Sequence, residues 1–308
     1  MIRLTLASNA LHLEAARRLR RLPELRAISG GPPRLEVLLW EPQRMALSAQ
    51  DRRLWPLRLP VAPLSLALLV PLALVGLVRE LRLAHLRNAG IALRQLARHA
   101  GRLVLLDDGL DQYRDQPRAV DPGRFPAGTA YWLFSDAPQA RAAWCERFRC
   151  HELGPLYAPP EPHAPREPPA PLPPPGSEGT LVIDAPGLER LAAAPQALTA
   201  TLPRPWWVAA HPVASKRSWS LAPSPGERQP AGPPEALIPR FSGWILVGES
   251  MTLLAAARLH RPEARVLICL PEAVDAGVAR LAAALVASDP ALSLWASAGL
   301  RRTPPAGR

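Results

Sequence analysis

The sequence predicts an α/β protein of two doubly wound domains, each built on a parallel sheet. Short apolar runs rich in β-prone residues alternate with helix-length segments along the 308 residues. A hydrophobic content of 48% is enough to give each of two domains a core. Between two such alternations, Ala158–Pro175 holds 10 prolines in 18 residues, which excludes helix or sheet interior. We therefore expect domains at 1–157 and 178–308, joined by a proline-rich linker at 158–177.

The first domain is expected to open with a strand over Arg3–Ala7 and a helix capped by Ser8 or Asn9. Its further strands are predicted at Leu35–Trp40, Leu54–Leu59, Leu103–Leu106 and Thr129–Phe134, and its further helices at Ser65–Arg87, Ile91–His99 and Arg141–Phe148. Val61–Val78 carries no charge over 18 residues, which is the length of a membrane span. Its internal prolines favour a buried helix broken near Pro71, with a membrane-dipping segment as the alternative.

The second domain repeats the alternation of strands and helices. Strands are predicted at Thr180–Asp184, Trp206–Ala210, Trp244–Val247 and Arg265–Cys269, and helices at Gly187–Ala194, Met251–Leu259 and Asp275–Ala287. Two α/β domains joined by a linker form a cleft, and clefts between domains are preferred ligand sites. We expect the two domains to face such a cleft.

Composition and net charge indicate which classes of binding partner to expect. The net charge is +11, but the basic residues are scattered and 36 of the 37 are arginine, with Lys216 the only lysine. Because aromatic residues are not interleaved with basic clusters, nucleic acid is not an expected partner. Attraction to an anionic membrane or an acidic substrate stays open. Three cysteines, Cys145, Cys150 and Cys269, suit neither a disulfide framework nor a zinc site, and with no signal peptide recognisable they favour a cytoplasmic setting.

The candidate chemistry of the first domain lies at the end of its Leu103–Leu106 strand. Asp107, Asp108 and Gly109 follow directly, where ligands of open α/β sheets gather. Successive residues point to opposite sides, so one aspartate is a candidate base and the other a structural acceptor. Gly109 allows a sharp turn and close approach of a substrate. The alternative is an ordinary loop whose acids cap the next helix.

Two strand ends of the second domain also carry polar groups. His211 and Pro212 end one strand, and the imidazole could donate a proton to a leaving phosphate or be structural. Another strand leads through Gly248, Glu249 and Ser250 to Thr252 and a helix. Free backbone N–H groups and the positive helix end of such a turn attract phosphate, although Ser250 could equally be a helix cap.

The run LVLLDDGLDQY, the strand ending in HP followed by SKR, and the strand leading into GESMT resemble bacterial sialyltransferases and polysialyltransferases of the GT-B type. That family has an acidic-acidic-Gly motif in its N-terminal domain, an HP motif in its C-terminal domain and a Ser/Thr motif further on. The order and placement match here, up to about Glu272, and LASNALHLEAA is similar to the family's first strand and helix. The resemblance implies two Rossmann-like domains facing a cleft.

The resemblance further implies a metal-independent, inverting transfer of sialic acid from CMP-sialic acid to a glycan hydroxyl, with no cofactor. Asp108 would be the base, supported by Asp107, and His211 would protonate or stabilise the departing CMP phosphate. Ser250 and Thr252, in the turn that begins at Gly248, would hold that phosphate or the donor carboxylate, and Pro212, next to His211, is also expected at the donor-binding site. Such an enzyme of polysaccharide biosynthesis would be cytoplasmic, with peripheral contact to the inner membrane as a further expectation.

The sequence departs from the family at Glu249, where a second hydroxylated residue is expected. A carboxylate beside a phosphate is unfavourable unless it points away. Two alternatives therefore stay open: a transferase for another CMP-activated acidic sugar such as Kdo, and a non-catalytic nucleotide- or sugar-binding relative. Acceptor, linkage, polymerisation and oligomeric state have no signal in the sequence.

Overall fold

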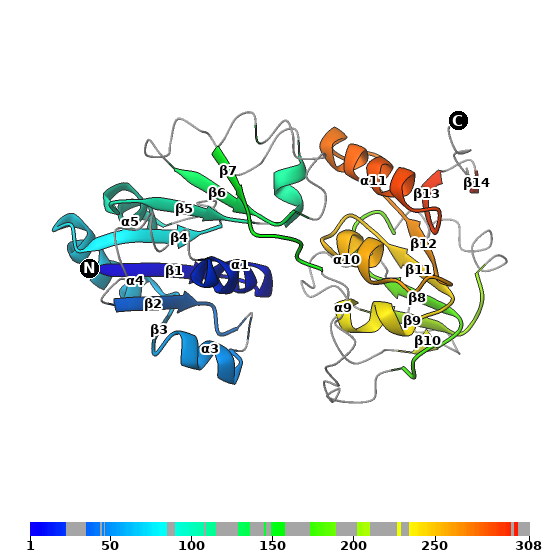
Figure 1. The fold of residues 1–308 in the computed structure, drawn as a ribbon, viewed down its shortest axis with the longest axis horizontal. Coiled ribbons are helices and arrows are strands. Elements are labelled where there is room, and N and C mark those ends of the chain that lie inside the picture. The colour runs from blue at the N-terminus through cyan, green and yellow to red at the C-terminus, as the bar shows by residue number, and fades with distance from the viewer. Residues whose placement is uncertain are drawn as a thin grey trace. The chain divides into compact units, whose positions relative to one another are not determined.

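A computed structural model describes residues 1–22, 35–43, 45, 47–84, 90–107, 109–114, 129–135, 145, 149–157, 173–188, 202–209, 227–228, 234–296 and 299–300. Contacts divide the chain into two compact units, 1–156 and 157–308. Each is an α/β unit built on a seven-stranded sheet (Figure 1). The predicted α/β class with two largely parallel sheets is confirmed, whereas a cleft between two GT-B domains stays a prediction.

The sheet of the first unit has the strand order β3-β2-β1-β4-β5-β6-β7, and all of its strands are parallel. Its strands are β1 (Ile2–Ala7), β2 (Leu35–Trp40), β3 (Leu57–Pro60), β4 (Val78–Leu83), β5 (Leu103–Leu106), β6 (Ala130–Leu133) and β7 (Arg149–Glu152). Its helices are α1 (Ala10–Arg21), α3 (Ala49–Leu54), α4 (Pro63–Leu74), α5 (Ile91–His99) and the 3₁₀ helix η1 (Gly109–Tyr113). The strand order reverses between β1 and β4, which makes the carboxyl ends of these two strands the switch point.

The second unit repeats this topology in the order β10-β9-β8-β11-β12-β13-β14, parallel except for the β13–β14 pair. Its strands are β8 (Thr180–Ile183), β9 (Trp206–Ala209), β10 (Glu227–Arg228), β11 (Trp244–Val247), β12 (Arg265–Ile268), β13 (Leu292–Ala296) and β14 (Gly299–Leu300). Its helices are α9 (Pro234–Leu237), the 3₁₀ helix η5 (Ile238–Arg240), α10 (Thr252–Leu259) and α11 (Ala276–Ser288). The switch point here lies between β8 and β11.

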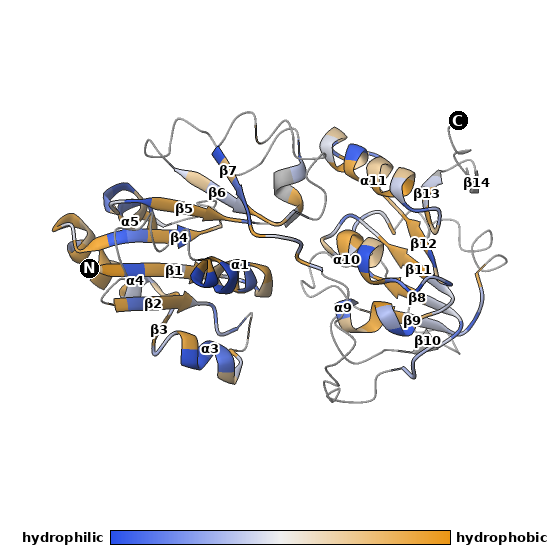
Figure 2. Cartoon of the chain, viewed as in Figure 1, coloured by the Kyte–Doolittle hydropathy of each residue, from blue (hydrophilic) through white to orange (hydrophobic). Residues whose placement is uncertain are grey.

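Alternate residues of each buried strand serve two different cores. In β5, Leu103 and Leu105 pack with α4 and α5 on one face, whereas Val104 and Leu106 pack with α1 on the other. A strand covered on both faces must be apolar at every position, which explains its continuous run of leucine and valine (Figure 2).

One predicted helix of the first unit is wrong. The segment predicted as a single helix over Ser65–Arg87 forms α4, which ends at Leu74, and then the central strand β4. Gly76 takes a φ of 74° between them, a left-handed conformation that ends the helix at low cost. Pro71 lies inside α4 and does not break it, which overturns the predicted break.

The strand β4 was hidden by its charges. Glu80 and Arg82 are buried, on the face that α1 covers, although such residues are rarely buried. Glu80 pairs with Arg82 at 2.5 Å and with Arg3 of β1 at 2.9 Å, and Arg3 also contacts Glu36 of β2 at 2.6 Å. Three adjacent strands thus neutralise one another's charges inside the sheet, so β4 lacks the continuous apolar run of the other buried strands.

The smaller elements also differ from expectation. The strand predicted over Leu54–Leu59 is the shorter β3, preceded by α3, and β7, β10, β13 and β14 were not predicted. The segments predicted as helices over 141–148 and 187–194 lie largely outside the described residues. No helix in the described part of the chain has the length and apolarity needed to cross a bilayer.

Candidate functional site

The turn after β11 lies at the switch point of the second sheet and is packed tightly against the loop after β8. A Cβ atom built on Gly248 would lie 2.4 Å from the carbonyl oxygen of Pro186 and 2.8 Å from that of Ala185. The next amide, that of Glu249, donates to the carbonyl oxygen of Pro186 at 2.6 Å. Only glycine fits where these two backbones cross, so the position of the turn is fixed by the main chain itself.

The helix α10 begins directly after this turn without a side-chain cap. Its N-cap residue is Met251, and Ser250, which could have capped the helix, instead contacts the hydroxyl of Thr252 through its own hydroxyl. In the described residues, the backbone N–H groups of Met251 and Thr252 donate to no backbone carbonyl. Two hydroxyls and two amide donors at the positive end of a helix dipole form an arrangement that can hold an anion.

Two residues of the neighbouring β8 loop also lie at this switch point but were not singled out in the sequence. Asp184 follows β8 directly and is buried, with its amide donating to Ala209 O at 2.9 Å. Gly187 has a φ of 103°, and a Cβ there would lie 2.2 Å from Cys269 O, beyond the end of β12. An acid directly after a strand, followed by glycine, repeats the Asp107–Gly109 pattern and was the available signal.

In the first unit, Asp107 is buried beyond the end of β5 and holds two backbone segments together. Its Oδ1 accepts the Gly109 amide at 2.8 Å, and its Oδ2 accepts the amide of Phe134, just beyond β6, at 2.9 Å. Gly109 has a φ of 82°, the left-handed region that the sharp turn requires. These contacts are those of a structural acceptor, so Asp107 anchors the turn between β5 and η1.

The switch point of the first unit carries Asn9 and His12, for which the sequence pattern predicts no catalytic role. Asn9 is the N-cap of α1, and its Oδ1 accepts the His12 amide at 2.9 Å, as predicted for a cap. The His12 ring is buried, with Nδ1 3.2 Å from the Ser8 amide and Nε2 3.1 Å from Asn9 Nδ2. The available signal was a polar Ser8-Asn9 pair directly after a strand.

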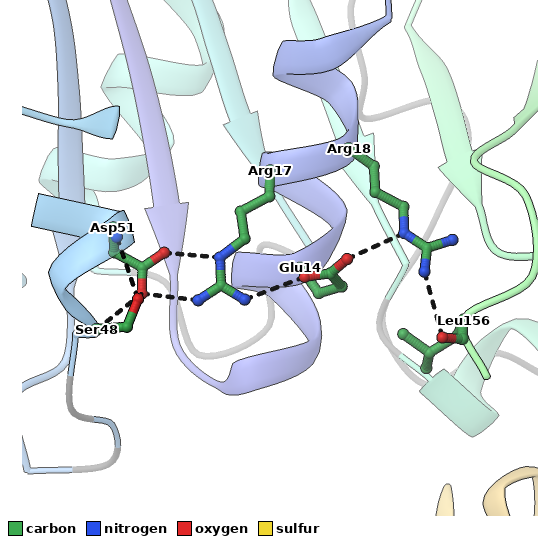
Figure 3. Close-up of polar contacts among 6 residues, drawn as sticks. All are labelled: Glu14, Arg17, Arg18, Ser48, Asp51 and Leu156. Atoms are coloured by element: carbon green, nitrogen blue, oxygen red, sulfur yellow. Dashed lines mark hydrogen bonds and ion pairs between the residues drawn. The ribbon is translucent and has the colours of Figure 1, made fainter. Parts of the chain in front are cut away.

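The helix α1 is joined to α3 by an ion pair (Figure 3). Arg17 donates to both carboxylate oxygens of Asp51 at 2.7 Å, while Asp51 and Ser48 form a capping box at the start of α3. The Asp51 bond raises the pKa of Arg17. Burial acts to raise the pKa of Asp51, but the bonds from Arg17 and Ser48 outweigh it and hold that pKa below its ordinary value.

The opposite side of α1 is tied to the end of the first unit. Glu14 lies between two arginines, 3.0 Å from Arg17 and 3.0 Å from Arg18. Arg18 donates in turn to the carbonyl oxygens of Leu153 and Pro155. It also donates to that of Leu156 (Figure 3). The helix that begins at the switch point is therefore held from both sides.

Several predicted site residues cannot be placed. Asp108, His211 and Pro212 lie outside the described residues. The structure therefore brings Gly248, Ser250 and Thr252 together in one turn and places Asp107 and Gly109 in another. The meeting of the two sets in a cleft stays a prediction. Within the described residues, no group of three or more His, Cys, Asp or Glu side chains could hold a metal ion.

Comparisons with known proteins leave the family open. No family model matches the chain, and no curated protein matches it. One solved structure, titled as a crystal structure analysis of the glycotransferase of kitacinnamycin, aligns with 97% of this chain and 86% of its own. The identity is 14% and the TM-score is 0.45, a level of overlap that does not establish a shared fold.

Proposed function

We propose that the protein is an inverting, metal-independent glycosyltransferase of the GT-B type that moves sialic acid from CMP-sialic acid to a glycan hydroxyl. The observation that carries the proposal is the uncapped start of α10 at the switch point of the second sheet, with the Ser250 and Thr252 hydroxyls beside it. In this proposal the turn binds the donor phosphate, because N–H groups, hydroxyls and a helix N-terminus all favour negative charge.

The first unit supplies the acceptor side in this proposal. Asp108 removes the proton of the acceptor hydroxyl, whose oxygen attacks the anomeric carbon from the face opposite the leaving group. The bond between that carbon and the phosphate oxygen of CMP breaks, and His211 protonates or stabilises the departing phosphate. Asp107 acts indirectly, since its two backbone hydrogen bonds fix the turn on which Asp108 lies.

Calorimetric titration with CMP and CMP-sialic acid, against UMP and GDP, tests the proposal. We expect selective binding of the cytidine nucleotides. The double variant Ser250→Ala/Thr252→Val should weaken it about tenfold, the size expected for loss of hydrogen bonds to a charged group. Ser288→Ala, which removes a hydroxyl at the far end of α11, serves as the matched control and should leave affinity unchanged.

One further variant and two assays with other substrates distinguish the proposed function from its alternatives. Glu249→Gln should bind CMP more tightly if the carboxylate faces the phosphate and equally well if it points away. Turnover with CMP-Kdo in place of CMP-sialic acid would assign another acidic sugar, and binding without turnover in any glycan screen would indicate a non-catalytic relative. Equal affinity for CMP, UMP and GDP would reject the proposed donor class.

A further inference from the structure

The helix α4 exposes an apolar face to the outside of the first unit. Leu64 and Leu68, one helical turn apart on the same side of α4, are 71% and 66% exposed. At the C-terminal end of the helix, Leu74 and Val75 are 58% and 70% exposed. The opposite side of α4, formed by Leu66, Leu69 and Ala73, is buried in the core. A helix that is apolar on both sides needs only one side for packing in the core. Core packing therefore does not explain the exposed leucines on the outer side.

The exposed face continues onto the amino edge of the sheet. Leu77, Met1 and Leu35 are 44%, 55% and 41% exposed. They are neighbours through backbone hydrogen bonds, from Ile2 N to Leu77 O at 2.8 Å and from Leu35 N to Met1 O at 3.3 Å. We define the α4 patch as Met1, Leu35, Leu64, Leu68, Leu74, Val75 and Leu77. It joins the outer side of one helix to the starts of three strands.

In the segment that carries most of the α4 patch, the exposed charges are of one sign. Residues 57–106 contain seven arginines and a single acid, Glu80, which is buried between Arg3 and Arg82. In the described part of this segment, the exposed charged side chains are therefore cationic: Arg79, at the start of β4, and Arg94 and Arg98, on α5, which packs beside α4. Arg79 reaches the patch itself, with one guanidinium nitrogen 3.0 Å from Met1 Sδ.

We propose that the α4 patch docks the first unit on an anionic lipid surface, an inference that goes beyond the proposed transferase activity and does not depend on it. Exposed leucines enter the boundary between headgroups and acyl chains, and neighbouring arginines pair with lipid phosphates. At 12 residues, α4 is about 18 Å long, too short for a hydrocarbon core of about 30 Å, so it lies in the interface plane.

A second copy of the chain fits the α4 patch less well. A two-fold dimer places the same surface of both copies against itself, which would bring Arg79 and Arg98 of each copy into one interface where no exposed acid of 57–106 would neutralise them. Lipid phosphates supply that neutralisation. Leu74, Val75 and Leu77 lie at the amino edge of the sheet, whereas Asp107 follows the carboxyl end of β5.

Vesicle flotation of the full chain tests this inference. We expect binding to vesicles of phosphatidylcholine with about one third phosphatidylglycerol, and weaker binding to pure phosphatidylcholine or in high salt. Leu64→Glu/Leu68→Glu should reduce binding at least about tenfold, since two exposed apolar side chains become acidic. Ala283→Glu, an exposed apolar-to-acidic change on α11 in the second unit, is the matched control and should bind as the wild type does.

Each outcome decides the matter. No flotation with anionic vesicles, or equal flotation of Leu64→Glu/Leu68→Glu and Ala283→Glu, overturns the inference. A concentration-dependent dimer in analytical ultracentrifugation that Leu68→Glu dissociates would assign the patch to a second copy instead. Circular dichroism of each variant verifies its folding, and CMP titration of the same variants keeps a failure here distinct from a failure of the proposed donor site.

Discussion

The helices that begin at the two switch points differ in how their N-termini are filled. In the first unit, Asn9 caps α1, and the His12 ring packs against the same turn. In the second unit, α10 starts at Met251 with no side-chain cap, and Ser250 contacts Thr252. In the first unit the polar side chains at the helix N-terminus therefore hydrogen-bond within the protein. In the second unit the backbone N–H groups at the helix N-terminus are left to bind an anion. This difference supports our proposal that the donor phosphate binds to the second unit.

The sheets themselves also differ in how they are held. The first unit joins β1, β2 and β4 through buried ion pairs, whereas the second unit interlocks its loops through glycines that approach neighbouring backbones. We therefore expect the first unit to be sensitive to changes of charge and the second to added volume. Four substitutions test this comparison, taken from the largest expected effect to the smallest.

Gly187→Ala should have the largest effect. Its methyl group would lie 2.2 Å from Cys269 O, on a backbone whose φ of 103° already disfavours a side chain. Strain and overpacking together should lower the free energy of unfolding by about 4 kcal/mol, measured by urea denaturation. The control is Gly90→Ala, where no atom lies within 4 Å of the added Cβ and φ is −63°. Equal stability of the two variants would contradict the interlocked loops.

Glu80→Gln should come second, because it leaves Arg3 and Arg82 without their shared carboxylate inside the sheet. Breaking a buried pair costs about 3 kcal/mol or more. Burial acts to raise the pKa of Glu80, but Arg82 and Arg3 outweigh it and hold that pKa below its ordinary value. The stabilisation is therefore complete above the ordinary glutamate pKa, about 4.3, and is lost as pH falls through the lower pKa of the folded state.

Urea denaturation of Glu80→Gln between pH 7 and pH 3 measures this dependence. The variant should lose less stability than the wild type over the acid range, since the group that titrates is gone. Glu263→Gln, in the exposed pair with Arg261, is the control and should leave stability unchanged. Parallel pH profiles for wild type and Glu80→Gln would show that the ion pairs of β4 contribute nothing to the acid response.

Strands were predicted correctly from the sequence where all their residues are apolar, and were missed where their buried residues are charged. Leu103–Leu106 and Trp244–Val247 were predicted at their observed bounds, because apolar runs of four residues leave no room for a helix. The strand β4 was missed because Arg79, Glu80 and Arg82 conceal its alternation, and only the ion pairs with β1 show why it is buried. Tertiary pairing of charges has no local signal.

The candidate site was predictable to a similar degree. Glycine beside a strand end marked Gly109 and Gly248, since close approach and positive φ leave a trace in residue type. The N-terminus of α10 was expected to begin with Ser250 as a possible cap, whereas Met251 takes that place. Which hydroxyl caps a helix depends on hydrogen bonds that a sequence pattern does not fix.

Asp107→Asn ranks third in effect and separates the two adjacent aspartates. An amide in place of the carboxylate can accept only one of the two backbone N–H groups, from Gly109 and Phe134, and turns a donor toward the other. We expect a loss of about 2 kcal/mol in the free energy of unfolding. Asp108→Asn should instead keep stability and abolish transfer to the acceptor. If both variants kept full stability, Asp107 would not anchor this turn.

Asn9→Ala should have the smallest effect on stability of the four substitutions. It tests directly the difference between the capped N-terminus of α1 and the uncapped N-terminus of α10. Removing the side-chain carbonyl of Asn9 leaves the His12 amide without its acceptor. This should lower the free energy of unfolding, measured by urea denaturation, by about 1 kcal/mol. Met251→Ala, at the same position of α10, removes no capping bond and should change stability less than Asn9→Ala does. Saturating CMP should stabilise wild type and Asn9→Ala by the same increment, because binding energy adds to stability only where the ligand binds. An increment that fell with Asn9→Ala would move the anion site to the first unit.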